Sequence, residues 1–283
     1  MWKKLWRRSN CPNGTIIHEQ KEVLHHIGKF YSKVFGNNDS NLDFDNLSNI
    51  IDNIKIPKVD FPDLDTPIQV GELGQALKQC KHNNTPGMDG LTSEFLKVFW
   101  IKLKYIVTNA INCCFLKRQL PTTLRQCVIT CLPKGDKDRS LIKNWRPISL
   151  LCVVYKLASG VIACRLRSTL DLVISKCQTG FIKGRLISET TRLVYDIMHY
   201  TEMNQLPGLL MLIDFEKAFD SLSWTYLYKV LDFFGYNEDF IQWIKLFNTD
   251  ITAYVIQCGF LSNKISIERG CRQGDPISAY LFY

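Results

Sequence analysis

Apolar residues recur every three or four positions in several stretches of the chain, the spacing that buries one face of a helix. The first such stretch covers residues 18–36, and Gly36 marks its end. Its shared apolar face consists of Val23, Ile27, Phe30 and Val34. The same spacing predicts further helices over residues 70–81, 153–172, 188–204, 223–235 and 239–248.

Another helix is predicted to begin after Thr92. A threonine at this position can accept a hydrogen bond from a backbone N–H of the first turn, which a helix start leaves unpaired. The pattern assigns its inner face to Phe95, Val98, Phe99, Leu103 and Ile106.

Two pairs of extended segments predict strands. Gln126–Leu132 and RPISLL (146–151) flank the charged loop KGDKDRSLIKNW, which indicates two strands with a basic tip. Thr252–Cys258 and Lys264–Glu268 resemble a hairpin. Because helices and strands alternate without βαβ regularity, the sequence favours an α+β fold.

The stretch LLMLIDFEKAFD (209–220) places five apolar residues directly before Asp214. Such a run, preceded by Pro207 and Gly208, is typical of a strand buried on both faces. A carboxylate at the end of a buried strand is costly unless a cation lies beside it. Asp214 is therefore expected to meet a cation, although a buried helix cap or a core ion pair would also account for it.

The distribution of charge along the chain is more informative than the net charge of +8. Residues 102–185 contain sixteen Lys and Arg side chains against three Asp, a net charge of +13. A region this basic most simply faces a polyanion, of which nucleic acid is the commonest, and solvated helix faces are the alternative. The longest apolar stretch, Leu150–Leu157, is interrupted by Lys156 and too short for a bilayer, so no membrane partner is expected.

An acid at a strand end, a basic strand pair upstream and a Gln-Gly turn downstream suit metal-dependent phosphoryl transfer. In that chemistry carboxylates hold Mg²⁺ while Lys and Arg neutralise a triphosphate.

Five blocks in one order carry a family resemblance. They are TPGMDG, LPKGDKDRSLIKNWRPISLL, QTGFIKGR, LMLIDFEKAFDSLSW and RGCRQGDPISAYLF. Together they resemble the successive blocks of non-LTR (LINE-type) retrotransposon reverse transcriptases over residues 70–283. The helix at 18–36 also resembles the segment that joins the endonuclease of that family to its polymerase. The resemblance implies a right-hand polymerase, with fingers and a ferredoxin-like palm, that copies an RNA template from a DNA primer using deoxyribonucleoside triphosphates.

The resemblance also implies roles around the acid. Asp214 would be the first catalytic carboxylate and a ligand of two Mg²⁺ ions, with Mn²⁺ as a possible substitute, and the Phe215 carbonyl would assist. Phe219 would be the aromatic wall that rejects a 2′-hydroxyl, with ordinary core packing as the alternative. Asp220 lies beyond the predicted strand and is assigned a structural role.

Three further blocks carry roles by resemblance. Lys134 and Arg146, at the basic tip, would grip the triphosphate. Gln273 and Gly274 would lie beside the incoming nucleotide, an ordinary turn being the alternative. The turn at QTGFIKGR would contact the template backbone, unless it is simply solvated, through Gly180, Lys183, Gly184 and Arg185.

The chain departs from the family pattern in one respect. It contains no Asp-Asp pair, whereas the family's palm carries a second strand with an aromatic-Ala-Asp-Asp turn. We therefore expect an incomplete palm, truncated before the second catalytic strand and inactive alone. The alternatives are a non-catalytic RNA-binding remnant or co-opted protein, and an RNA-templated RNA polymerase or intron-maturase relative.

Three regions are expected along the chain. Residues 1–66 would form an N-terminal helix and a linker, residues 67–185 the basic fingers, and residues 186–283 the partial palm. An intracellular location, in nucleus and cytoplasm, is expected of such a protein.

Overall fold

The computed structural model describes residues 19–36, 61, 64–182 and 184–282, together with the backbone of residues 9–10 and 16–17. The two short backbone pieces, β1 (Ser9–Asn10) and β2 (Ile16–Ile17), pair as an antiparallel ladder. Most of the expected linker after Asn37 lies outside the described residues.

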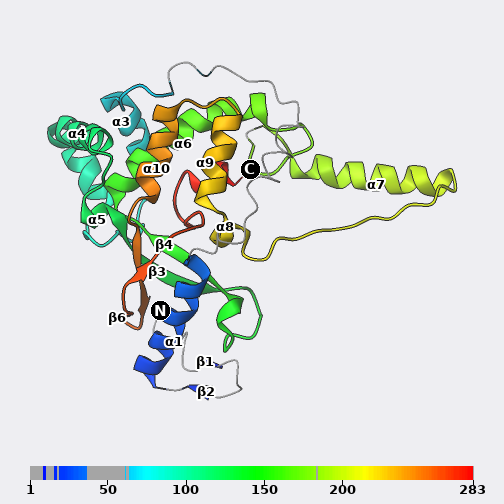
Figure 1. The fold of residues 1–283 in the computed structure, drawn as a ribbon, viewed down its shortest axis with the longest axis horizontal. Coiled ribbons are helices and arrows are strands. Elements are labelled where there is room, and N and C mark those ends of the chain that lie inside the picture. The colour runs from blue at the N-terminus through cyan, green and yellow to red at the C-terminus, as the bar shows by residue number, and fades with distance from the viewer. Residues whose placement is uncertain are drawn as a thin grey trace.

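A five-stranded sheet forms the centre of the molecule (Figure 1). Its order is β4 (Trp145–Leu150), β3 (Gln126–Pro133), β5 (Thr252–Gln257) and β6 (Phe260–Leu261), and β7 (Ile265–Ser266) also pairs with β5. β3 runs antiparallel to β4 and parallel to β5. Both predicted strand pairs are therefore confirmed, and segments more than a hundred residues apart meet in one sheet.

Helices cover the sheet, and most of them gather on one side of it (Figure 1). The most deeply buried helices are α6 (Val153–Val173), which contributes Leu157 and Ile162, and α10 (Glu238–Asn248), which contributes Phe240 and Trp243. α3 (Val70–Gln79) and α9 (Trp224–Phe233) add Leu73, Leu77, Leu227 and Leu231 to the same core. On the other side, α1 (Gln20–Phe35) packs against β5 and β7.

The helices predicted from the apolar spacing are present, and the fold is α+β as expected. Ser223 caps α9 by accepting a hydrogen bond from the amide N–H of Tyr226, at 3.3 Å. Short helical turns complete the fold: α5 (Thr122–Arg125), the 3₁₀ turn η2 (Ile142–Asn144), α8 (Ala218–Ser221) and α11 (Ser278–Leu281). Within the described residues, no helix combines the length and apolar character that crossing a bilayer requires.

The helix after Thr92 is confirmed as α4 (Ser93–Leu116), but its predicted inner face is wrong. Thr92 caps it as expected, accepting from the amide N–H of Phe95 at 3.2 Å. The buried positions are Ser93, Leu96, Thr108 and Ile111. Apolar residues lie on more than one side of α4, so their spacing allowed more than one face to be the inner one.

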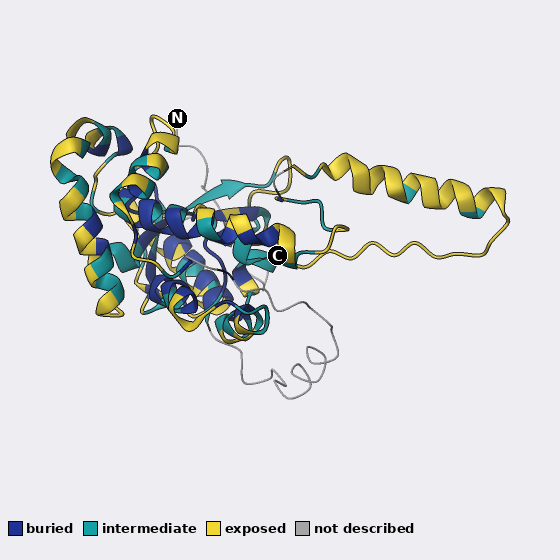
Figure 2. Cartoon of the chain, turned by 90° about the horizontal axis from the view of Figure 1, so that it is seen from above, coloured by how far each residue is buried: buried dark blue, intermediate teal, exposed yellow. Residues whose placement is uncertain are grey.

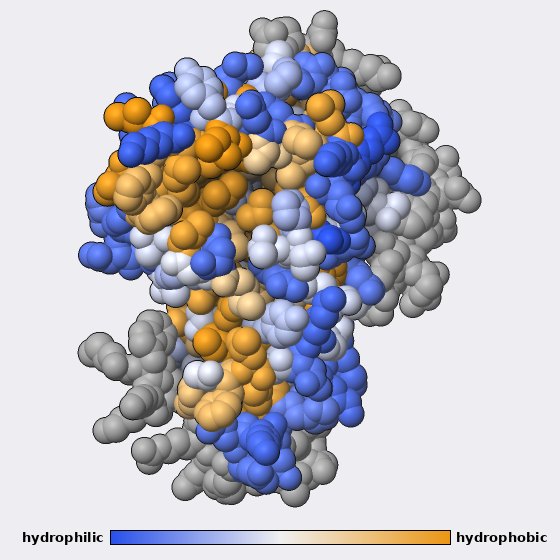
Figure 3. Space-filling model, turned by 90° about the vertical axis from the view of Figure 1, so that its left-hand side faces the viewer, coloured by the Kyte–Doolittle hydropathy of each residue, from blue (hydrophilic) through white to orange (hydrophobic). Residues whose placement is uncertain are grey.

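The residues assigned to the inner face of α4 are largely exposed, and they join other exposed apolar side chains on this helix. These are Phe95, Val98, Phe99, Ile101, Tyr105, Ile106 and Leu116. α4 lies on the side of the molecule that Figure 3 presents, where apolar side chains gather into a patch.

The predicted buried strand at 209–213 is also wrong. These residues form no strand, and each apolar side chain from Leu209 to Ile213 is exposed, Leu212 by 85%. The segment returns to the body apart from α7 (Ile187–Met203), an exposed helix that projects from the body (Figures 1 and 2). A strand needs a partner for its backbone N–H and C=O groups, and no described strand pairs with this segment. We refer to residues 187–216 as the arm.

Candidate active site

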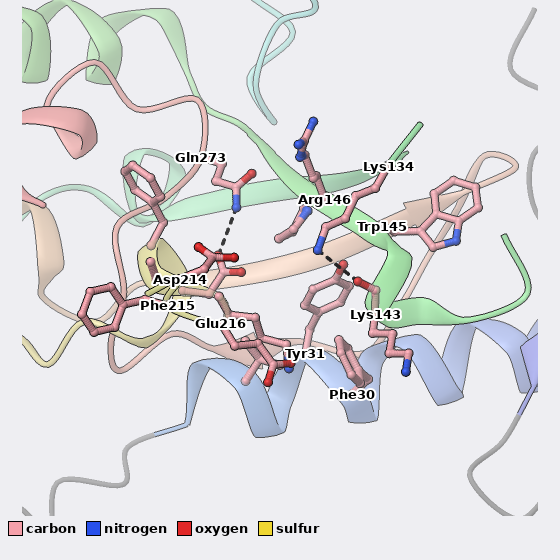
Figure 4. A pocket seen from close by; sticks show the side chains of 16 residues that line it. Phe30, Tyr31, Lys134, Lys143, Trp145, Arg146, Asp214, Phe215, Glu216 and Gln273 are labelled. Atoms are coloured by element: carbon pink, nitrogen blue, oxygen red, sulfur yellow. Dashed lines mark hydrogen bonds between the residues drawn. The ribbon is translucent and has the colours of Figure 1, made fainter. Parts of the chain in front are cut away.

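A cavity of about 420 Å³ lies where the arm meets the body, between the basic loop after β3 and helix α1 (Figure 4). Six of the residues predicted to belong to the site line it: Lys134, Arg146, Asp214, Phe215, Phe219 and Gln273. They come from three separate blocks of the chain. The remaining lining residues are Phe30, Tyr31, Val34, Lys143, Trp145, Pro147, Glu216, Lys217, Ala218 and Asp220.

Asp214 brings an unneutralised carboxylate to this cavity. Its side chain is exposed, and it has no hydrogen bond or ion pair with any other described residue. The exposure rules out the alternative of a buried cap or core ion pair. Glu216 and Asp220 add two carboxyl groups to the lining. Even so, no group of three His, Cys, Asp or Glu side chains among the described residues is placed to hold a metal ion.

The basic wall is the loop between β3 and β4. The Lys134 ammonium donates to the Lys143 carbonyl at 3.1 Å, which closes the base of the loop (Figure 4). The Trp145 indole N–H donates to the Arg139 carbonyl at 2.9 Å and fixes the loop from inside. Arg146 is exposed, and its guanidinium has no described partner. The loop therefore offers a fixed Lys and an available Arg, the planar fork that suits a phosphate.

The Gln273-Gly274 turn forms the opposite wall. The Gln273 side-chain amide donates to Asp220 Oδ1 at 3.4 Å, and its carbonyl accepts from the Ser149 amide N–H at 2.7 Å. Gly274 has a φ of +108°, and a Cβ there would lie 2.8 Å from the Ser149 carbonyl oxygen. Only glycine fits this position without strain, so the sequence choice is explained by the close approach of the turn to β4.

A buried polar cluster anchors this turn to the core. The Arg272 guanidinium pairs with the Asp275 carboxylate at 3.3 Å, and the Tyr155 hydroxyl donates to Asp275 at 2.6 Å. Ser159, also on α6, donates to the other oxygen of Asp275. Arg272 also donates to the Phe247 carbonyl, at 3.0 Å. None of these residues was predicted to have a role, although the opposite charges of Arg272 and Asp275 flanking Gln-Gly are a recognisable signal for a braced turn.

Phe219 and Asp220 lie on the short helix α8, which follows the arm. Phe219 is half-buried, and its ring stacks on Phe282 with centroids 4.6 Å apart. Asp220 is buried, and this burial raises the pKa of its carboxyl to about 6, while the hydrogen bond from Gln273 and the nearby Lys217 and Lys134 act to lower it. Asp220 is thus part of the cavity wall as well as of the packing.

The QTGFIKGR turn lies apart from this cavity. The Arg185 guanidinium donates to the carbonyls of Ser175 and Gln178, at 2.5 and 2.7 Å, and pairs with Asp171 at 3.1 Å. It closes the turn on the end of α6. Gly180 and Gly184 belong to the same turn, whereas Lys183 falls outside the described residues. The template contacts assigned to this turn stay predictions.

Helix α1 was expected only to precede the polymerase, yet it closes the cavity from below. Phe30, Tyr31 and Val34 of α1 all line it. The Cys131 thiol on β3 donates to the Tyr31 hydroxyl oxygen at 3.5 Å, and burial raises the pKa of this phenol. Apolar spacing identified this face of α1 but could not indicate what the face covers.

The comparisons with known proteins agree with this arrangement. The family model described as reverse transcriptase (RNA-dependent DNA polymerase) matches residues 132–283, more than half of the chain. The chain belongs to the reverse transcriptase family. The match includes the basic loop, Asp214 and the Gln-Gly turn, the three blocks that meet at the cavity.

Retrotransposon proteins are among its relatives. The chain is 36% identical over 77% of its length to an uncharacterized 149 kDa protein of transposon TX1 from Xenopus laevis. It is 29% identical over 73% of its length to a Pol polyprotein of retrotransposable element R1 from Bradysia coprophila, and 30% over 76% to one of element R2 from Popillia japonica. The resemblance to non-LTR retrotransposon reverse transcriptases is confirmed. The chain spans 17%, 20% and 29% of these relatives.

Proposed function

We propose that this chain is the part of a retrotransposon reverse transcriptase that binds the incoming deoxyribonucleoside triphosphate opposite an RNA template. The observation that carries the proposal is the single cavity that gathers Lys134, Arg146, Asp214, Phe219 and Gln273 from separate blocks. Such convergence of charged and polar groups in one concavity is typical of a substrate site.

The regions proposed for the chain are an N-terminal region (1–66), fingers (67–185) and part of a palm (186–283). The parallel pairing of β3 with β5 joins the last two in one sheet, and α1 attaches the first to the same body. In this arrangement the fingers supply the cationic wall of the cavity. The palm supplies its carboxylates.

The side chains of each wall suit one part of a nucleotide. Lys134 and Arg146 would bind the triphosphate through charge-assisted hydrogen bonds, which are stronger than neutral ones. The Phe219 ring would lie against the sugar, where it leaves a 2′-hydroxyl without a partner. Gln273 would lie beside the base. The net charge of +13 over residues 102–185 would attract the RNA template and DNA primer.

The family uses divalent metal ions, and Mg²⁺ or Mn²⁺ would be held by the Asp214 carboxylate with the Phe215 carbonyl. When bound, the ions neutralise charge on the transferring phosphoryl group. The described residues supply no set of three ligands, so these side chains alone do not complete such a site. We accordingly propose that residues 1–283 bind their substrates but extend no primer unaided.

The incomplete set of metal ligands among the described residues also favours a second candidate, a non-catalytic protein that binds RNA alone. The experiment that separates the two measures nucleotide affinity in the presence of a pre-bound RNA template and DNA primer. We expect dATP to bind when the template presents uracil, to bind more tightly than ATP, and to lose that preference in Phe219→Ala.

The salt dependence of RNA binding is measured with the same sample. We expect a log–log slope of several units, which Lys134→Ala combined with Lys183→Ala and Arg185→Ala should flatten. RNA binding without template-matched nucleotide binding would favour the second candidate. No RNA binding at low salt by a folded sample would contradict both.

A further inference from the structure

Lys217 is a cavity residue to which neither the sequence analysis nor the comparisons assign a role. It lies between Asp214 and Phe219 and lines the same cavity. Its backbone is left-handed, with φ 53° and ψ 36°, a conformation that residues with a Cβ adopt only where the surroundings hold them. Its carbonyl accepts from the amide N–H groups of Asp220 and Ser221, at 2.8 and 3.1 Å. The direction of the Lys217 side chain is therefore set by the start of α8.

The ammonium group of Lys217 has a fixed neighbour. It lies over the ring of Phe30 on α1, 4.8 Å from the ring centroid, where the negative face of the ring attracts it. Lys217 and Lys134 both act to lower the pKa of Asp220, which shows that both charges lie near that carboxyl group. Lys217 thus lies at the wall of the cavity that helix α1 forms.

The cavity is lined by four cationic side chains and three acidic ones, so it can accept an anion. Its cations are Lys134, Lys143, Arg146 and Lys217, and its acids are Asp214, Glu216 and Asp220. Among the described residues Lys217 forms no ion pair within salt-bridge distance, and neither does Arg146. An ammonium in this state, held over a ring rather than bonded to a carboxylate, keeps its three donors available.

We propose that Lys217, steadied by Phe30, is a further phosphate-binding cation of this cavity and contacts the polyphosphate of a nucleoside triphosphate. The assignment rests on the proposed function, because it takes the cavity as the nucleotide site. It also gives α1 a role, since the Phe30 ring determines where the Lys217 charge lies. The competing explanation is that Lys217 only compensates the Asp220 carboxyl.

Calorimetric titration of the folded chain with dATP and with dAMP, in Mg²⁺ buffer, tests the assignment. Lys217→Ala should weaken dATP binding about tenfold, the usual effect of losing one charge-assisted hydrogen bond. It should change dAMP binding by less than about twofold, because the lost contact is to the outer phosphates. Lys217→Arg should restore most of the dATP affinity.

Two further variants locate the effect. Phe30→Leu keeps an apolar side chain against the core but removes the ring, and should weaken dATP binding by about threefold. Lys78→Ala is the matched control, since Lys78 is an exposed lysine on α3 that does not line the cavity, and it should change nothing. Circular dichroism of each variant confirms that it is folded.

The outcomes separate this assignment from the proposed function. If the unmodified chain binds dATP and Lys217→Ala binds it equally well, the Lys217 assignment fails while the nucleotide site stands. If the unmodified chain binds no triphosphate, both fail. An equal loss of dATP and dAMP would show that Lys217 only shapes the cavity, and contradicts the assignment. So would a Lys217→Ala effect that disappears in an Asp220→Asn background.

Discussion

Helices α6 and α7 have similar origins in the sequence and different fates in the fold. Both were predicted from apolar spacing, and both are present within a residue or two of the predicted limits. α6 buries eleven residues in the core, whereas α7 buries none (Figure 2). The local pattern is enough to specify a helix, but burial depends on whether another element is available to cover it.

The strands repeat the contrast. β3 lies between β4 and β5 and pairs with both of them. The apolar run at 209–213 has at least as strong a strand pattern, yet it lies exposed in the arm. Residues of the body pack against other elements, whereas residues of the arm have no described packing partner. The same substitution should therefore change the free energy of unfolding differently in the two regions.

The largest difference is expected for ion pairs. In the body, Arg272 and Asp275 are only 8% and 9% exposed, so Asp275→Asn leaves a buried guanidinium uncompensated and should lower the free energy of unfolding by ~3–5 kcal/mol. In the arm, Arg192 and Asp196 form an exposed pair at 3.6 Å, and Asp196→Asn should cost ~0.5 kcal/mol or less. Urea unfolding of both variants checks this. Equal effects would break the distinction between body and arm.

A cavity-forming substitution should separate the regions next. Leu157 on α6 is fully buried, and Leu157→Ala should lower the free energy of unfolding by ~2–5 kcal/mol through lost packing. Leu212 in the arm is 85% exposed, so Leu212→Ala should change it by less than ~0.5 kcal/mol. Because both variants carry the same leucine-to-alanine change, each is the control for the other. A large loss at Leu212 would mean that the arm is packed against something in solution.

A smaller effect on stability is expected at Asp220, on the short helix α8 that joins the arm to the body. Burial raises the pKa of this carboxyl from 3.8 to about 6, so the folded state favours the protonated form. Its contribution to stability is complete below about pH 4 and is lost as the pH rises through about 6.

Asp220→Asn imitates the neutral carboxyl and should remove this loss. We expect the variant to be more stable than the unmodified chain at pH 7, by ~1–3 kcal/mol, and nearly equal to it at pH 4. Thermal unfolding across this pH range provides the measurement. A variant that is less stable at pH 7 would show that the charged form of Asp220 is the one the fold requires.

The sequence predicted most of the elements because helix spacing, capping residues and short strand pairs are local properties. Thr92 and Ser223 cap the helices expected of them, and the basic loop lies between the two strands assigned to it. The segments that pack against each element were harder to predict. The inner face of α4 and the strand at 209–213 were wrong because each depends on which surface another segment covers.

The candidate site divides in the same way. Family blocks identified Asp214, Arg146 and Gln273, which do meet at one cavity. The helix α1 wall and the contacts that bury the Arg272–Asp275 pair against α6 were not predictable, because both arise between segments far apart in the sequence. Asp220 was placed outside the site on the assumption of a straight strand through Asp214. With that strand absent, the chain turns into α8 and brings Asp220 into the wall.

The central claim is that the cavity where the arm meets the body binds a nucleoside triphosphate. It is tested most directly by photolabelling the folded chain with an azido-substituted dATP and identifying the labelled peptides by mass spectrometry. We predict labelling within Lys134–Pro147 and Asp214–Asp220, suppressed by excess dATP and weakened in Arg146→Ala. Labelling that falls instead on α3 or α4, or that excess dATP does not suppress, would contradict the claim.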